Sequence, residues 1–128
     1  MTNIANQMPF SKLMGVEVTN ATSERVQGQL KVRPDLCTLG GILHGGAIMA
    51  FADALGAIGG ALNLPDESAG TTTIESKTNF LAAAKEDSII FGVATPVKVG
   101  RKISVWKTEI RRDDNTLIAI VLQTQLVL

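Results

Sequence analysis

Strict alternation of apolar and polar residues marks the first clear element of the chain. In RVQGQLKVR, residues 25–33, every second residue from Val26 to Val32 is apolar or glycine, and the residues between them are basic or amide-bearing. This period of two predicts a β-strand with one buried face and one wet face. Four later stretches are rich in β-branched residues and predict further strands, at about 70–81, 88–99, 102–112 and 116–128.

The connections between the later strands are short. VGRK joins the second of the four to the third, and RDDN joins the third to the fourth, where Asn115 tolerates the positive φ that such turns need. Short connections favour antiparallel neighbours. Five apolar residues of the last stretch share one face: Ile118, Ile120, Leu122, Leu126 and Leu128.

A long helix, at roughly 45–62, is apolar on nearly every side. Such a helix must be covered all round, and a strongly curved sheet can do that within one subunit. A weak amphipathic pattern predicts a short helix over 3–14, while RPDLCTLGG and NLPDESAG read as loops. The whole chain, 1–128, therefore predicts a single α+β domain with an antiparallel sheet around one helix.

A membrane span is the alternative explanation of the apolar helix. The segment from Leu39 to Leu64 is long enough, and Gly56 and Gly60 form a GxxxG pair. Asp53 would then lie near the bilayer centre, at a cost of about 2.5–3.5 kcal/mol. Because the rest of the chain reads as a soluble sheet, we expect no membrane partner.

Composition narrows the functional classes. The 128 residues carry 12 basic and 12 acidic side chains, and this balance argues against broad nucleic-acid binding. The one cysteine, Cys37, cannot form an internal disulfide, so we expect a reducing, cytoplasmic location. One cysteine and one histidine also argue against a zinc site, and the N-terminal sequence has no signal-peptide pattern.

Asp53 stands out because it is the one charged or hydrogen-bonding side chain between Gly46 and Ala61. Aspartate is a poor mid-helix residue, and a buried, unpaired carboxylate is costly. Two explanations remain open on these grounds. The carboxylate either performs chemistry or is paired at a subunit interface.

The helix opens with the tripeptide His44-Gly45-Gly46. At a helix start the backbone N–H groups are free and the dipole is positive, so two glycines there let a ligand oxygen approach closely. A flexible helix start without a ligand is the alternative. His44 could be a base, a donor to a carbonyl or a packed polar residue, and a pairing with Cys37 is a minor possibility.

Distance separates these two features. Asp53 lies eight residues after Gly45, which is about 12 Å along a helix. One small reacting group could hardly touch both within the same helix. If Gly45 and Asp53 act on one substrate, they come from different subunits.

Three segments together resemble the hotdog-fold acyl-CoA thioesterases. GILHGGAIMAFADALGA is similar to their HGGxxxxxxD/E signature, TTTIESKTNFLAAA to a T-x-E-x-x-x-x-F strand, and VKVGRKISVWKTEIRRDDNTLIAI to a turn-and-strand pair. The branch that contains phenylacetate-pathway and second-type 4-hydroxybenzoyl-CoA thioesterases is the most similar. The resemblance implies a curved sheet around a central helix. It also implies homodimers with sites at the interface, often paired into homotetramers, that hydrolyse acyl-CoA without a cofactor.

The resemblance also implies roles for individual residues. Asp53 matches the catalytic carboxylate, which is a nucleophile or a general base, and Gly45 matches the glycine whose N–H polarises the thioester carbonyl. His44 matches a supporting histidine of the same loop, and Thr73 matches a Ser/Thr near the acid. Arg101 matches a turn residue that reaches the coenzyme A phosphates.

Two further residues, Lys102 and Gly46, are expected to help bind coenzyme A; without the resemblance, Arg101 and Lys102 would read as solvated charges beside a turn. One departure concerns Thr38, which stands where relatives carry Asn or Gln. Its hydroxyl can still donate but reaches less far. The main rival function is a non-catalytic acyl-CoA sensor or carrier; a hydratase and an interaction module are the others.

Overall fold

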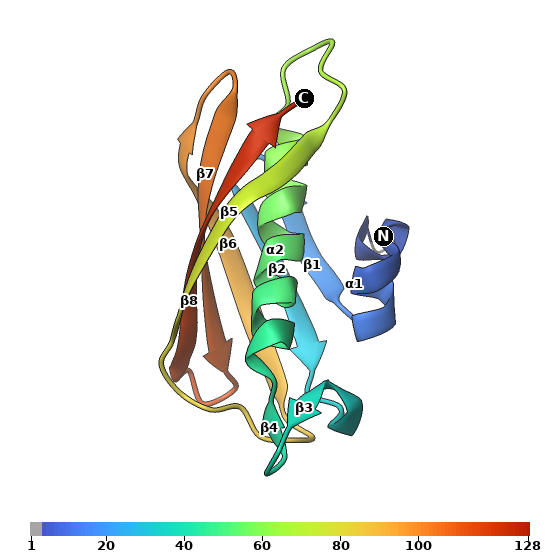
Figure 1. The fold of residues 1–128 in the computed structure, drawn as a ribbon, viewed down its shortest axis with the longest axis vertical. Helices are drawn as coiled ribbons and strands as arrows, with labels where there is room; N and C mark the ends of the chain where they lie inside the picture. Colours follow the sequence, from blue (N-terminus) through green and yellow to red (C-terminus); the bar gives the residue numbers. More distant parts are fainter. Residues whose placement is uncertain (1–3) are drawn as a thin grey trace.

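The computed structural model describes residues 4–128 and shows a six-stranded antiparallel sheet curled around one long helix (Figure 1). The helix, α2, runs from Gly45 to Leu62. The strand order is β1-β2-β6-β7-β8-β5. The strands are β1 (Glu17–Thr22), β2 (Arg25–Lys31), β5 (Thr71–Phe80), β6 (Ile89–Val99), β7 (Ile103–Arg112) and β8 (Leu117–Val127). The predicted sheet around a central helix is therefore confirmed.

The N-terminal segment differs from the prediction of one helix over 3–14. It contains a 3-10 helix, η1 (Ile4–Gln7), and a separate helix, α1 (Pro9–Met14), and residue 3 lies outside the described residues. Pro9 explains the break, because proline fits the first turn of a helix but not its interior. Strand β1 was not predicted, since EVTNAT has only one buried apolar residue, Val18.

The predicted loop before α2 is more ordered than its composition suggests. After the short 3-10 helix η2 (Pro34–Leu36), β3 (Cys37–Thr38) pairs with β4 (Ile42–Leu43) in a tight hairpin. Gly40 and Gly41 form its turn with φ of +83° and +70°, which glycine adopts without strain. This hairpin leads directly into the start of α2.

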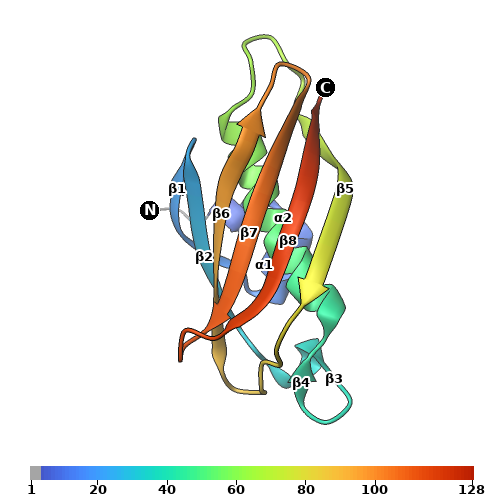
Figure 2. The same ribbon diagram turned by 90° about the vertical axis from the view of Figure 1, so that its left-hand side faces the viewer.

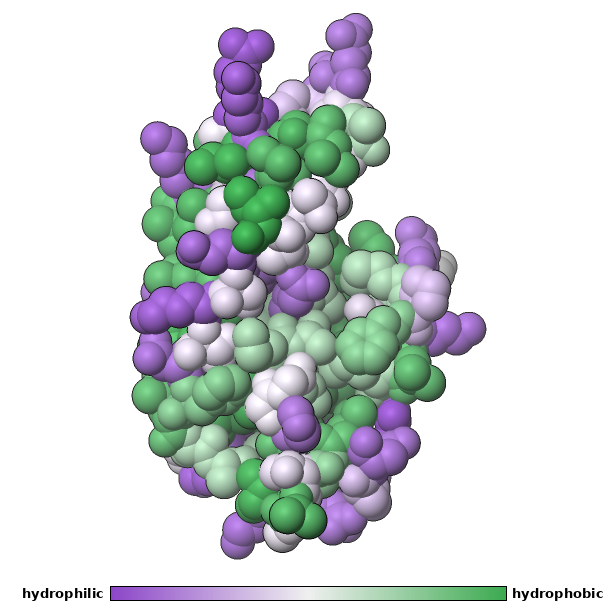
Figure 3. Space-filling model, viewed as in Figure 1, coloured by the Kyte–Doolittle hydropathy of each residue, from purple (hydrophilic) through white to green (hydrophobic). Residues whose placement is uncertain are grey.

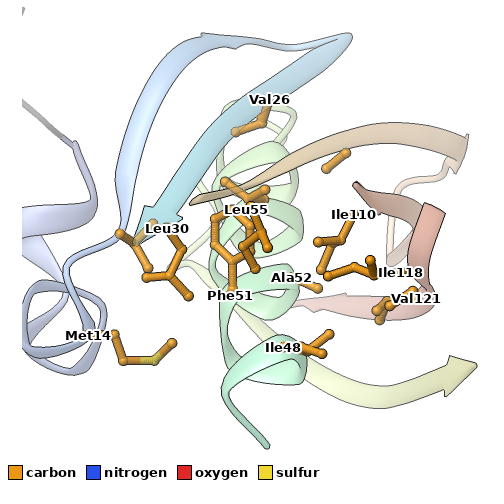
Figure 4. Packing of buried hydrophobic residues seen from close by; sticks show 14 of the residues in the cluster. Met14, Val26, Leu30, Ile48, Phe51, Ala52, Leu55, Ile110, Ile118 and Val121 are labelled. Carbon is orange, nitrogen blue, oxygen red and sulfur yellow. The ribbon is translucent and has the colours of Figure 1, made fainter. Parts of the chain in front are cut away.

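The core lies between α2 and the concave face of the sheet (Figures 2 and 4). Phe51 and Leu55 of α2 are fully buried against β2 and β6, where Gly28 and Gly92 are paired neighbours. A Cβ on Gly28 would lie 2.9 Å from the Leu55 side chain, and one on Gly92 would lie 2.7 Å from it. These two glycines therefore let the helix approach the sheet closely, which explains a glycine on the apolar face of the predicted strand.

Ile118, at the start of strand β8, is fully buried, but from Ile120 onward the row of side chains predicted to share its face lies toward the outside. Leu122 and Leu128 are partly exposed, whereas Val121, Gln123 and Gln125 on the other side are buried beneath α2. The inward row of β8 is thus partly polar, and this brings two amides to the middle of the molecule.

Among residues 4–128, one helix is long and apolar enough to cross a membrane, and it is α2. It lies inside the curve of the sheet, which covers part of its circumference (Figure 2). The GxxxG pair that favoured a span has an internal explanation. A Cβ at Gly56 would overlap the Gln123 carboxamide, and one at Gly60 would lie 2.9 Å from Gln125 Cγ.

Candidate active site

The Asp53 side chain is held by two neighbouring strands. The Thr73 hydroxyl on β5 donates to Asp53 Oδ1 over 2.6 Å, and Gln123 Nε2 on β8 donates to the same oxygen over 3.2 Å. Asp53 itself is half-buried. The structure thus brings together two of the predicted site residues, Asp53 and Thr73.

The two oxygens of this carboxylate have different surroundings. Oδ1 accepts both hydrogen bonds, and no hydrogen bond from residues 4–128 reaches Oδ2. An irregularity in the β5–β8 pairing follows Thr73 directly, between it and Glu75. Such bulges re-aim side chains next to functional sites. The arrangement leaves one carboxylate oxygen available to a ligand.

The helix start has one free donor. His44 is the N-cap of α2, and its Nδ1 accepts the Gly46 N–H over 2.8 Å. Ala47 N–H and Ile48 N–H both donate to the His44 carbonyl. Within the described residues, Gly45 N–H has no partner. Of the two glycines, Gly45 can therefore offer its N–H to a ligand, while Gly46 already uses its own.

This cap also fixes the state of the His44 ring. In the neutral form of the ring, this hydrogen bond to Nδ1 assigns the proton to Nε2. His44 is exposed, so Nε2–H can reach a ligand. The side chain is suited to donating rather than to accepting a proton, which weakens the assignment of His44 as a base.

A cavity of about 530 Å³ lies between α1 and the first turns of α2. His44 and Gly46 form part of its wall, and much of the rest is apolar: Phe10, Leu13, Met14, Leu36, Ala47 and Ala50. The Phe10 and Leu13 side chains are 62% and 69% exposed, so in one copy of the chain most of their apolar surface is in contact with solvent. The cavity offers apolar room directly beside the helix start.

Cys37 lines the same cavity but is poorly suited to nucleophilic chemistry. Its thiol donates to the Arg33 carbonyl over 3.4 Å. Partial burial, followed by nearby carboxylates such as Glu86, raises the pKa of the Cys37 thiol. A thiol with a raised pKa is less often the reactive thiolate, so the minor Cys37–His44 possibility receives no support.

The remaining predicted residues lie away from Asp53. Thr38 is exposed in the hairpin that leads into α2. Arg101 and Lys102 are exposed in the β6–β7 turn, where they line a surface hollow with the loop that follows α2. Arg101 makes no salt bridge with any described residue, although Asp66 and Glu67 line the same hollow. Arg101 thus lies near the C-terminal end of α2, whereas Gly45 is its first residue; the β6–β7 turn and the start of α2 are at opposite ends in Figure 1.

One side of α2 is not covered by the sheet. Apart from Met49, the helix residues on this side are mostly small or polar, including Gly46, Ala50, Asp53 and Ala57. Figure 3 shows this side, with green and pale surface running down its middle and long purple side chains projecting at its rims. Strand β5 beside it is a sheet edge, so its outer backbone groups have no strand partner among residues 4–128. Asp53 thus lies on the side of α2 that the sheet leaves uncovered, next to a free strand edge.

These features define a class of protein: an α+β domain in which a curved antiparallel sheet wraps one long helix, with a carboxylate halfway along that helix. The sequence model of the thioesterase superfamily matches residues 40–119, more than half of the chain, and the chain belongs to this superfamily.

Known proteins agree with this assignment. A Mycobacterium tuberculosis protein named "putative esterase" is 26% identical over 88% of this chain and 81% of its own length. Its solved structure has a TM-score of 0.89 at 25% identity, covering 94% of this chain and 97% of that one. A thioesterase structure from Haemophilus influenzae has a TM-score of 0.83 at 26% identity, covering 90% and 79%. The Arabidopsis thaliana 1,4-dihydroxy-2-naphthoyl-CoA thioesterase 2 is 27% identical over 82% of this chain and 66% of its own length.

The predicted hotdog fold and thioesterase family are therefore confirmed, and the protein is a thioester hydrolase. Sequence reasoning missed Gln123 and Gln125, which contact Asp53 and Thr73. Their alternation with Leu122, Thr124 and Leu126 showed that they share a face, but it could not show that this face is buried.

Proposed function

We propose that this hydrolase cleaves acyl-CoA thioesters in sites that two copies of the chain build together. The observation that carries the proposal is the Asp53 carboxylate, which is held by Oδ1 and free at Oδ2. The named activity of the Arabidopsis relative supports a coenzyme A thioester as the substrate class. Arg101, an exposed cation without a salt bridge in the described chain, is available for the phosphates of coenzyme A.

The chemistry needs a donor and a carboxylate. Gly45 N–H, with the positive end of α2 behind it, stabilises the oxyanion that develops on the thioester carbonyl. His44 Nε2–H lies in the same loop and can add a second donor. Asp53 Oδ2 either takes a proton from the attacking water or attacks the carbonyl itself. Thiolate leaves readily, so no strong general acid is required.

A second copy solves the distance problem between these groups. Thr73, near the start of β5, donates a hydrogen bond to Asp53. Phe80, at the other end of β5, lies beside Gly45, since a Cβ on Gly45 would be 3.2 Å from its ring. If two β5 edges pair antiparallel about their middles, the Thr73 end of one strand lies beside the Phe80 end of the other. That pairing puts Asp53 of one copy near the Gly45 of its partner.

The same pairing would explain two other features. A ten-residue edge strand with exposed Ile74 and Phe80 is a liability unless another strand covers it. Arg101 lies toward the opposite end of α2 from Gly45, so it also approaches a site that uses Gly45 of the partner. One site would then take Asp53 and Arg101 from one copy and the helix start from the other.

The cavity beside His44 provides room for the acyl group. It adjoins the helix start at which we place the thioester carbonyl. Its wall is largely apolar, and its two charged lining residues, Arg33 and Asp35, pair with each other at 3.0 Å. This favours an apolar acyl group over a charged one. A thiol-release assay with short, medium, long and aromatic acyl-CoAs, and with a dicarboxylic acyl-CoA for comparison, measures this preference.

The rival function, acyl-CoA binding without turnover, does not explain the residues of the site. A carrier needs no carboxylate with a free oxygen on the exposed side of its central helix. A hydratase would need a basic histidine beside the carboxylate to take a proton from the substrate. The N-cap bond at Nδ1 leaves His44 with a donor, not a base, facing a ligand.

Substitution of Asp53 by asparagine tests the proposal. Asp53→Asn keeps the shape of the side chain and removes its charge, so we expect kcat to fall by at least ~10²-fold, the usual size of acid–base effects. Binding of acyl-CoA, measured by calorimetry, should be retained. A well-folded variant with near-normal turnover would show that Asp53 is not the catalytic carboxylate.

A further inference from the structure

Two glutamines lie where a protein core is normally apolar. Gln123 and Gln125 are 1% and 0% exposed, and they are the only polar residues among the largest fully buried side chains of residues 4–128. A buried amide costs free energy unless it is hydrogen-bonded. Apolar side chains would fill the same volume under α2 without that cost, so the amides need an explanation.

The central helix is shaped to accommodate them. An alanine at position 56 would overlap the Gln123 carboxamide, and one at position 60 would crowd Gln125 Cγ at 2.9 Å. A glycine inside a helix is destabilising relative to alanine. Gly56 and Gly60 thus leave the space that the side chains of Gln123 and Gln125 occupy.

The hydrogen bonds of these amides converge on one atom. The Thr71 hydroxyl has one proton and two acceptors within reach, Gln125 Oε1 at 3.1 Å and the Leu126 carbonyl at 3.0 Å. Gln125 Nε2 donates to the Thr73 hydroxyl oxygen over 2.6 Å. Because Thr73 accepts that bond, its single proton is free to go to Asp53 Oδ1. Gln123 Nε2 approaches the same Oδ1 from β8.

The orientation of Gln123 is set by Asp53 alone. Its Oε1 is buried and has no hydrogen-bond partner among the described residues. An inverted amide would instead point Oε1 at the carboxylate, which is repulsive. The amide thus donates to Asp53 through Nε2 while its Oε1 stays without a hydrogen bond. This is expected of a residue that is retained for its effect on the carboxylate.

We infer that Gln123 and Gln125 are positioning residues of the reaction, which hold Asp53 by Oδ1 so that Oδ2 is the oxygen presented to the thioester. Gln123 acts on the carboxylate directly, and Gln125 acts by directing the Thr73 hydroxyl toward it. The inference rests on the proposed catalytic role of Asp53. Neither glutamine touches substrate in this arrangement, so both should affect kcat much more than KM.

Methionine substitutions test this inference. Gln123→Met and Gln125→Met keep the length of the side chain and remove the donor. We expect each to lower kcat about tenfold with little change in KM, since small misplacements of a reacting group have effects on the order of 10²-fold or less. Thr108→Val is the matched control. It alters another buried polar side chain of the same sheet, whose hydroxyl has no partner in the described chain, and should leave kcat unchanged.

Double variants separate positioning from general damage. In an Asp53→Asn background, Gln123→Met should cause no further loss, because its effect passes through the carboxylate. In a Thr73→Val background, Gln125→Met should likewise cause little further loss. A tenfold loss that persists in both backgrounds would overturn the inference, and so would wild-type kcat in both single variants.

Three measurements distinguish failure of the proposed function, failure of the positioning role and loss of the fold. The Asp53→Asn single variant reports on the proposed function, and the change caused by each methionine reports on positioning. Thermal unfolding of every variant identifies loss of the fold. If Gln123→Met does not fold, the Gln125→Met and Thr73→Val pair decides the inference, since it changes a different contact of the same network.

Discussion

The His44 side chain makes one hydrogen bond that can be separated experimentally from its remaining donor. Asparagine at this position can still cap α2, whereas alanine cannot. We expect His44→Ala to lower the free energy of unfolding by about 1 kcal/mol and His44→Asn to change it by a few tenths at most. Both variants lack Nε2–H, so both should lower kcat. Urea unfolding and thiol release measure the two effects.

A contrary result would be equally clear. Wild-type kcat in His44→Asn would mean that the histidine serves only as a helix cap. The comparison matters because the Nδ1 contact with Gly46 is present in a single chain, while any contact of Nε2 requires a ligand or a partner.

Individual site residues differed in how well the sequence revealed them. Asp53 was visible because a lone acid in an apolar helix is chemically costly, and the structure places the Thr73 hydroxyl within hydrogen-bond distance of it. Gln123 and Gln125 were not visible, because their strand carries its larger apolar side chains on the opposite face. Alternation identifies the two faces of a strand, but only packing shows which face is buried.

The β7–β8 turn contributes stability that depends on pH. Asp114 accepts a hydrogen bond from the Thr116 N–H over 3.0 Å and pairs with Arg112 at 3.2 Å. Backbone and side-chain bonds with Thr116, followed by Arg112, lower the pKa of Asp114 from 3.8 to about 2. The contribution is therefore complete above pH ~4 and is lost as the pH falls toward 2.

Removal of this carboxylate should change the acid response. We expect Asp114→Asn to be less stable than wild type above pH 4, and the difference to shrink steadily as the pH approaches 2. Unfolding by urea at a series of pH values measures this difference. A difference that stays constant down to pH 2 would show that these contacts do not favour the charged form.

Helices and strands followed the sequence where the hydrophobic pattern was regular. The predictions near 45–62, 88–99 and 102–112 lie within a few residues of α2, β6 and β7. Strand β1 and the β3–β4 hairpin were missed, because the first has little apolar pattern and the second depends on a glycine turn. These short elements are stabilised by their neighbours rather than by their own periodicity.

Arg101, near the C-terminal end of α2, is expected to contribute to the affinity for acyl-CoA. A contact with a remote phosphate contributes mainly uniform binding, so Arg101→Ala should raise KM for acyl-CoA more than it lowers kcat. The effect should diminish at high salt, as expected for an exposed charge. Lys31→Ala, at an exposed position on β2, is the control. An unchanged KM at low salt would leave Arg101 as a solvated charge.

Mixing two inactive variants tests most directly whether two copies of the chain complete one site. One variant is Asp53→Ala. The other is Gly45→Pro, which lacks the free N–H; proline suits the first helical position, and His44 already has the extended backbone favoured before proline. Each should be nearly inactive alone. The oligomeric state of both is measured first, because a Cβ at position 45 would lie 3.2 Å from the Phe80 ring.

Mixing under conditions of subunit exchange should restore activity. In a mixed dimer one site would take Gly45 from the Asp53→Ala copy and Asp53 from the Gly45→Pro copy, so it would be intact, while its twin carries both changes. With random exchange between equal amounts, we predict about a quarter of wild-type activity per site. If labelled subunits demonstrably exchange and activity remains at the level of the separate variants, Gly45 and Asp53 do not meet across an interface, and the shared site is contradicted.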